Sequence, residues 1–107
     1  MNALLVYNFF LAVLILLIAI PLALKKISPN SLYGIRISKS LKSETNWYAI
    51  NEYAGKQMIV WSIVHLIFLL IVWKLSANLS FNKAVIYGGP FMPLIPIILT
   101  LIYTRKF

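Results

Sequence analysis

Three long apolar segments, separated by two more polar ones, dominate the pattern of side chains along the chain. The first covers residues 3–24 without a charged side chain. As a helix it would be about 33 Å long, close to the roughly 30 Å of a bilayer's hydrocarbon core. The second covers residues 57–73 and the third residues 84–103, both without Asp, Glu, Lys or Arg. This pattern predicts an all-α membrane protein, with three transmembrane helices in a single domain over residues 1–107.

The polar segment between the first two spans, residues 25–56, is called the central stretch here. It begins with two lysines that end the first span. Pro29 disfavours helical geometry in the residue before it, and Asn30 and Gly34 favour turn and left-handed conformations. The sequence therefore predicts a turn over this part of the central stretch.

Helix signals return at Ser43, which suits an N-cap, and at Glu44, whose charge suits the first turn of a helix. The expected apolar face carries Trp47, Ile50, Ala54 and Met58, and other faces carry Tyr48, Asn51, Glu52 and Lys56. This spacing predicts an amphipathic interfacial helix that leads into the second span. Gly55 fits either a bend between the two helical segments or a close contact between helices.

Polar and helix-breaking residues interrupt the spans at a few positions. Asn8, near the N-terminal end of the first span, is expected to face headgroups, with a hydrogen bond to a neighbouring helix as the alternative. His65 lies near the middle of the second span; we interpret it as a neutral imidazole packed against another helix, and a functional role is the alternative. Glycines and prolines make the first half of the third span irregular, which predicts either a kinked, packed helix or a polar cavity.

Composition excludes an ordinary soluble domain, because 62% of the residues are hydrophobic and only 11% are charged. The chain has no Cys, and a lone His lacks the further ligands of a metal site, so we expect neither a metal nor a cofactor. The net charge of +8 comes from basic residues that flank the spans, which indicates a membrane lipid surface and not nucleic acid as the partner.

The distribution of basic residues predicts the orientation. With three spans, the central stretch and the C-terminal tail share one side of the membrane and together carry eight Lys and Arg residues, against two between the second and third spans. The positive-inside rule places the side with eight in the cytoplasm. We therefore predict a multi-pass cell-membrane protein with its N-terminus outside and its C-terminus in the cytoplasm.

Two motifs in the central stretch resemble the bacterial SdpI family: P-N-x-x-Y-G-I-R at residues 29–36 and E-x-x-W-x-x-x-N-x-x-x-G at residues 44–55. The chain differs in having Ile37-Ser38 where the family commonly has Thr-Pro, and Ser40 where it often has Thr. The resemblance implies an immunity protein that protects against, or senses, a membrane-acting toxic peptide. It also implies binding residues in the motif, which are Asn30, Tyr33, Gly34, Arg36, Glu44, Trp47 and Asn51.

The physical chemistry of these residues leaves two roles open. Arg36 and Glu44 are oppositely charged groups near the membrane surface, where a hydrogen-bonded pair is worth more than in bulk water. Such a network either only folds the loop onto the helices, or forms a polar pocket at the cytoplasmic side for a lipid headgroup, a peptide or a regulatory protein.

Other functional classes have weaker support. No spacing among Glu44, Glu52, His65 and the tyrosines matches a catalytic constellation, so we expect no enzyme and no catalytic residue. A small transporter would need a carboxylate inside a span, and both carboxylates lie in the central stretch. A lipid- or partner-binding subunit of a membrane complex stays open as the alternative function, and three spans are too few for a self-sufficient pore, which keeps a homo-oligomer open.

Overall fold

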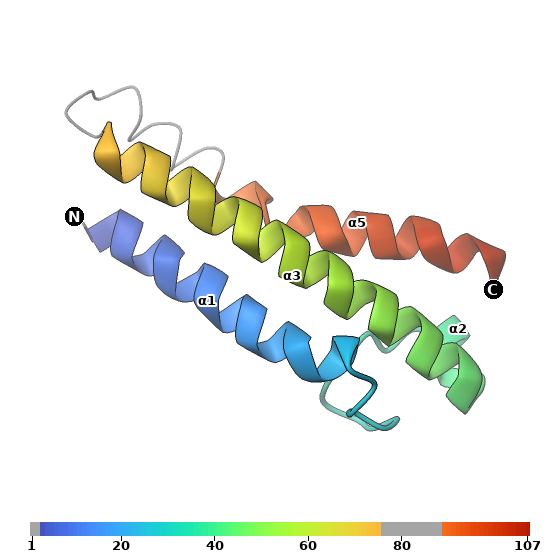
Figure 1. The fold of residues 1–107 in the computed structure, drawn as a ribbon. Coiled ribbons are helices and arrows are strands. Elements are labelled where there is room, and N and C mark those ends of the chain that lie inside the picture. Colours follow the sequence, from blue (N-terminus) through green and yellow to red (C-terminus); the bar gives the residue numbers. More distant parts are fainter. Residues whose placement is uncertain (1–2, 76–88) are drawn as a thin grey trace.

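A computed structural model of the chain describes residues 3–75 and 89–107, and its architecture is shown in Figure 1. These residues form helices and turns and contain no strand. The helices are α1 (Ala3–Ala23), α2 (Ser38–Leu41), α3 (Glu44–Lys74), η1 (Gly89–Phe91), α5 (Leu94–Tyr103) and η2 (Thr104–Lys106). The predicted all-α class is therefore confirmed.

The longest helix, α3, lies in the middle of the molecule. Helices α1 and α5 both pack along it, and both run antiparallel to it (Figure 1). The loop between α1 and α3 therefore lies at the same end of the bundle as the C-terminus, and the N-terminus lies at the other end. This arrangement is the one that the predicted topology requires, while the side of the membrane that each end faces stays a prediction.

Helix α1 packs on α3 through a narrow seam with the 3.5-residue repeat of a coiled coil. The buried residues on α1 are Leu5, Asn8, Ala12, Ala19 and Leu22. Two of the five are alanines, and small side chains let the backbones of two membrane helices approach closely. Leu5 packs with Leu69 and Val72 of α3 in the cluster nearest the N-terminus.

Helices α1 and α3 approach each other closely at Gly55. A Cβ atom at this position would lie 2.5 Å from the backbone N of Ala23 and 2.9 Å from the carbonyl O of Ala19. Helix α3 continues through Gly55 without interruption. Of the two interpretations of this glycine, close contact between helices is therefore the one that the structure supports.

Helix α3 is one continuous helix that contains both the predicted amphipathic helix and the predicted second span. It begins at Glu44 with Ser43 as its N-cap, and the Ser43 Oγ accepts a hydrogen bond from the Asn46 backbone N–H at 3.0 Å. Its 31 residues correspond to about 46 Å, which is longer than a bilayer core of roughly 30 Å. By length and composition, α1 and α3 are the two described helices that are able to cross a membrane.

The predicted third span is only partly covered by the described residues, because positions 84–88 lie outside them. The irregular first half is confirmed where it is described, since η1 comes first and α5 begins only at Leu94. Pro96 is tolerated because it is the third residue of α5, where a backbone N–H would have no partner within the helix. The ten residues of α5 span only about 15 Å, so a third complete span stays a prediction.

The outer surfaces of the three long helices are strongly apolar. More than twenty large hydrophobic side chains are exposed, among them Phe10 and Leu17 on α1, Ile67 and Ile71 on α3 and Ile98 on α5. So large an exposed apolar surface is unfavourable in water and is typical of helices that face lipid.

Candidate functional site

The first half of the central stretch is folded by the side chain of Asn30. Its Oδ1 accepts hydrogen bonds from the backbone N–H groups of Leu32 at 2.8 Å and Tyr33 at 2.6 Å. Its Nδ2 donates to the carbonyl O of Ser28 at 2.8 Å and of Tyr33 at 2.9 Å. Because one short amide side chain satisfies four backbone groups, it closes the turn without help from other elements.

The turn is attached to α3 through Asn51. The Asn51 Oδ1 accepts the Ile35 N–H at 2.6 Å, and its Nδ2 donates to the Trp47 carbonyl O at 3.0 Å. Gly34 has a φ of +111°, and a Cβ there would lie 2.7 Å from the Asn51 Oδ1. Asn51 is only 2% exposed, so the prediction that it lies away from the apolar face of its helix is wrong. Its partner is the loop, which helical periodicity does not reveal.

Two aromatic residues fix the loop on the bundle. The Trp47 Nε1 donates to the Ile27 carbonyl O at 2.8 Å, and the indole is fully buried. The Tyr33 hydroxyl donates to the carbonyl O of Ile18 in the last part of α1. Burial raises the pKa of the Tyr33 phenol, which keeps it protonated and able to donate at neutral pH.

Two further polar residues, which do not belong to the predicted binding residues, also support the loop. The buried Ser40 donates its hydroxyl to the Ile35 carbonyl O at 2.6 Å and accepts the Ile37 N–H at 3.0 Å. The Asn46 Nδ2 donates to the Lys39 carbonyl O at 3.0 Å. For Ser40 the one signal lay in the resemblance noted above, in which this position corresponds to one that is often Thr.

The loop also contacts the C-terminal end of the chain. The Lys39 Nζ donates to the Thr104 carbonyl O at 3.0 Å. Tyr53 of α3 stacks on Tyr103 of α5 with 4.0 Å between ring centroids, and the Lys106 Nζ lies 4.3 Å from the centroid of the Tyr103 ring. The residues between α1 and α3, called the central loop from here on, therefore form one connected polar end of the bundle with the start of α3 and the C-terminus.

Arg36 and Glu44 do not form the ion pair considered from the sequence. The Arg36 Nε donates to the Asn30 carbonyl O at 2.8 Å, so the guanidinium lies against the Asn30 turn. Glu44 is exposed at the first turn of α3 and takes part in no ion pair with the described residues. Arg36 therefore bonds a backbone carbonyl and not the Glu44 carboxylate, because the turn brings the Asn30 carbonyl within its reach.

The carboxylate that is paired is Glu52. Its two oxygens each lie 3.1 Å from a lysine Nζ, one of Lys56 in the next turn of α3 and one of Lys25 at the end of α1. These hydrogen bonds, first that of Lys56 and then that of Lys25, lower the pKa of Glu52. Lys25 itself has a φ of 59° and closes α1, because its N–H bonds the carbonyl of the third residue before it.

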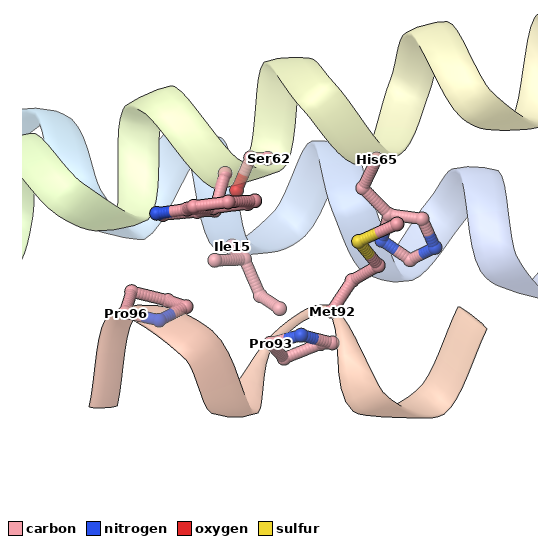
Figure 2. Close-up of a pocket in the computed structure, with 7 residues that line it drawn as sticks. Ile15, Ser62, His65, Met92, Pro93 and Pro96 are labelled. Atoms are coloured by element: carbon pink, nitrogen blue, oxygen red, sulfur yellow. The ribbon is translucent and has the colours of Figure 1, made fainter. Parts of the chain in front are cut away.

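Buried polar side chains also lie between the helices, away from the loop. Asn8 of α1 is 2% exposed and donates to the Leu4 carbonyl O at 2.9 Å, so the expectation that it faces headgroups is wrong. His65 of α3 is 1% exposed, and Gly89 is so close to both that its Cβ would lie 2.7 Å from the Asn8 Oδ1 and 3.7 Å from the His65 Nε2. Figure 2 shows His65 beside residues of α1 and α5.

The structure thus divides the seven motif residues into two groups. Five of them, Asn30, Tyr33, Gly34, Trp47 and Asn51, hold the loop together and attach it to the helices. The other two, Arg36 and Glu44, are exposed on the surface of the loop and at the start of α3. These two charged groups are presented on a hydrogen-bonded loop, which suits binding.

Fold and surface together define an all-α protein of the membrane. The family model of the SdpI/YfhL protein family matches residues 26–104, about three quarters of the chain, so the chain belongs to that family. The match covers the central stretch from Lys26, all of α3 and α5, and Thr104, the first residue of η2. Neither a curated protein nor a solved structure matches the chain.

Proposed function

We propose that this protein protects the membrane that contains it against a membrane-acting toxic peptide, or senses such a peptide, through the exposed surface of the central loop. Family membership supports the class of protein. The observation that carries the site is the division of the motif: five of its residues form a partly buried hydrogen-bonded framework, and Arg36 and Glu44 stay exposed. On this proposal the loop lies on the cytoplasmic side, and the protein is not an enzyme.

The chemistry of the surface suggests what it binds. Arg36 uses its Nε on the Asn30 carbonyl, which leaves its terminal amino groups directed to other partners. Leu32 on the same turn is 94% exposed. An apolar side chain beside a guanidinium fits a peptide segment that carries an apolar residue next to a carboxylate. Glu44, on the helix that supports the turn, would bind a basic group of the same peptide.

The test challenges cells that express the protein with a panel of membrane-active peptides and follows growth together with the amount of protein in the membrane. The variants are Arg36→Ala and Glu44→Ala, with Lys42→Ala as a control that removes an exposed charge outside the motif. We expect wild type and the control to protect, and the two motif variants to lose protection at unchanged abundance. Loss of protection only where abundance falls would assign both residues to folding, and no protection by the wild type against any peptide would contradict the proposed function.

A second function, as a lipid- or partner-binding subunit of a membrane complex, rests on a different observation. Helices α2 and η2 lie at the same end of the molecule as the loop between α1 and α3 (Figure 1), and they contain the basic residues Lys39, Arg105 and Lys106. Such a cluster attracts anionic headgroups. If anionic phospholipid co-purifies with the protein in native mass spectrometry, and charge-removing changes in α2 and η2 release it, this second function gains support over the first.

A further inference from the structure

A groove with apolar walls, called the apolar groove here, lies between α1, α3 and α5. It has a volume of about 190 Å³, and its walls are Ile15 and Ile18 of α1, Met58 of α3, and Pro93 and Ile97 in and just before α5. Ile15 and Pro93 also line the small pocket drawn in Figure 2, so the two spaces are neighbours. Because Ile18 and Ile97 are both exposed, the apolar groove opens to the surroundings of the bundle.

The apolar groove lies at membrane depth, near the end of the bundle that carries the central loop. Along the helices, Ile18 is roughly 8 Å from Ala23, the last residue of α1, and Ile97 is roughly 10 Å from Thr104, the first residue of η2. The Tyr33 hydroxyl donates to the Ile18 carbonyl O, so the central loop reaches the wall of the groove. A lipid chain that starts at the membrane surface extends over about 15 Å, half of a hydrocarbon core of about 30 Å. The chain of a lipid whose headgroup lies beside the loop therefore reaches the groove.

The walls limit what is able to fill the apolar groove. All five side chains are apolar, and even an enclosed apolar cavity of about 150 Å³ stays dry and takes an apolar molecule instead of water. An empty groove would lose the dispersion contacts of its walls. Lipid tails are as apolar as these side chains, so packing and not hydrophobicity decides what binds here. A hydrocarbon chain in a groove contacts protein on several sides at once, which favours a chain as the occupant.

Basic residues follow both of the outer helices that wall the groove. Lys25 and Lys26 follow α1, and Arg105 and Lys106 belong to η2, directly after α5. The end of α1 and the C-terminus lie at the same end of the bundle (Figure 1). Lys25 is paired with a carboxylate, whereas Lys26 and Arg105 are exposed. Basic side chains at this depth attract the headgroups of anionic lipids.

We propose that the apolar groove binds one acyl chain of an anionic phospholipid whose headgroup lies at Lys26 and Arg105. The walls supply the site for the chain, and the basic residues that follow them select the charge of the headgroup. This site goes beyond protection against a peptide and does not depend on it. It extends the lipid-binding alternative, because attraction of a headgroup alone does not require the groove.

The test measures which lipid the full-length protein retains. The protein is placed in nanodiscs of phosphatidylcholine and phosphatidylglycerol in equal amounts, transferred to a mild detergent and analysed by native mass spectrometry. We expect the wild type to retain phosphatidylglycerol in preference to phosphatidylcholine. Met58→Trp fills the groove and should lose most of the retained lipid, whereas Val60→Trp adds the same side chain at an exposed position of the same helix and should retain it. Lys26→Gln and Arg105→Gln should each lower the retained phosphatidylglycerol by about fivefold.

Two outcomes would overturn the proposal. The first is a wild type that retains no phosphatidylglycerol. The second is a Met58→Trp protein that retains as much as the wild type, which would leave a headgroup site without a chain in the groove. Circular dichroism of Met58→Trp separates loss of the lipid from loss of the fold. A measurement on the wild type covers a variant that fails to fold: phosphatidylglycerol with a spin label on its acyl chain should broaden the methyl signal of Met58 more than that of Met92, and equal broadening would contradict the site.

Protection against peptides is a separate readout of the same variants. A wild type that retains the lipid but protects against no peptide would contradict the proposed function and leave this site standing. A Met58→Trp protein that keeps its lipid and loses protection would instead assign the groove to the peptide, and would overturn the lipid site.

Discussion

The Asn51 side chain and the backbone of Ile35 are joined by a hydrogen bond of 2.6 Å, and this contact connects the central loop to α3. The same amide also donates to Trp47 one helical turn earlier, so both ends of the side chain are used. Because Asn51 is buried, water cannot replace it. Asn51 is therefore one of the residues that attach the loop to α3.

Replacing Asn51 by Ala should destabilise the protein by about 1–3 kcal/mol, because it leaves the partly buried Ile35 N–H without its partner. Unfolding in mixed detergent micelles, followed by circular dichroism or tryptophan fluorescence, measures the change. Thr45→Ala on the exposed side of the same helix is the control and should have a small effect. Equal stability of the two variants would show that the contact is dispensable.

Gly34→Ala should also destabilise the loop, for a reason that does not involve hydrogen bonds. The φ of +111° is unfavourable for any residue with a side chain, and the new Cβ would lie 2.7 Å from the Asn51 Oδ1. Backbone strain of this kind costs about 1–3 kcal/mol. Ser31→Ala, in the same exposed turn, is the matched control. Protease accessibility of the loop reports the difference, and a Gly34→Ala loop as resistant as the control would contradict the expectation.

The features that the sequence predicted are those set by local interactions. Ser43 and Glu44 mark the start of α3 because capping depends on neighbours in the sequence. The turn at Asn30 was predicted for the same reason, since all the hydrogen bonds of the Asn30 side chain are to residues at most three positions away. Apolar segments long enough to cross a membrane likewise need no knowledge of their neighbours in space.

The features that the sequence missed or left open depend on partners far along the chain. Asn51 was placed on the wrong face because its partner is 16 residues earlier. Gly55 allowed two interpretations because the contact that decides between them, with Ala23, is on another helix. Asn8 was expected near headgroups because its close neighbour, Gly89, is more than 80 residues away.

Gly55→Leu should separate α1 from α3. Even a Cβ atom would lie 2.5 Å from the Ala23 backbone N, and backbone cannot move aside as the end of a side chain can. Overpacking costs about 1–3 kcal/mol in cores that are able to adjust, so a loss at or above that range is expected here. Val60→Leu, at a half-exposed position of the same helix, controls for added volume. Thermal unfolding in nanodiscs checks the result; similar midpoints would refute the close contact.

Lowering the pH should weaken the contact between α1 and α3 at Glu52. Its two lysine partners lower the pKa of the carboxyl below the ordinary value of 4.5. Its contribution to stability is therefore present above about pH 4.5 and is lost as the pH falls through the lowered pKa. The effect is small, because Lys25 and Lys56 are exposed and salt screens them. Stability of wild type and Glu52→Gln, measured from pH 7 to pH 3, should converge at low pH; a constant difference would rule out this titration.

Exchanging the charges of Arg36 and Glu44 should not rescue the single variants. A paired arginine and glutamate would recover when both are reversed, but Arg36 donates to the Asn30 carbonyl O at 2.8 Å and Glu44 lies outside any described ion pair. Glutamate at position 36 has no N–H to give that carbonyl and would repel it. We therefore expect Arg36→Glu to destabilise the loop to the same extent with or without Glu44→Arg, so a double-mutant cycle on stability should give a coupling energy near zero. A coupling of more than about 0.5 kcal/mol, the usual limit of additivity for independent sites, would restore the ion pair and with it a charge-paired recognition surface.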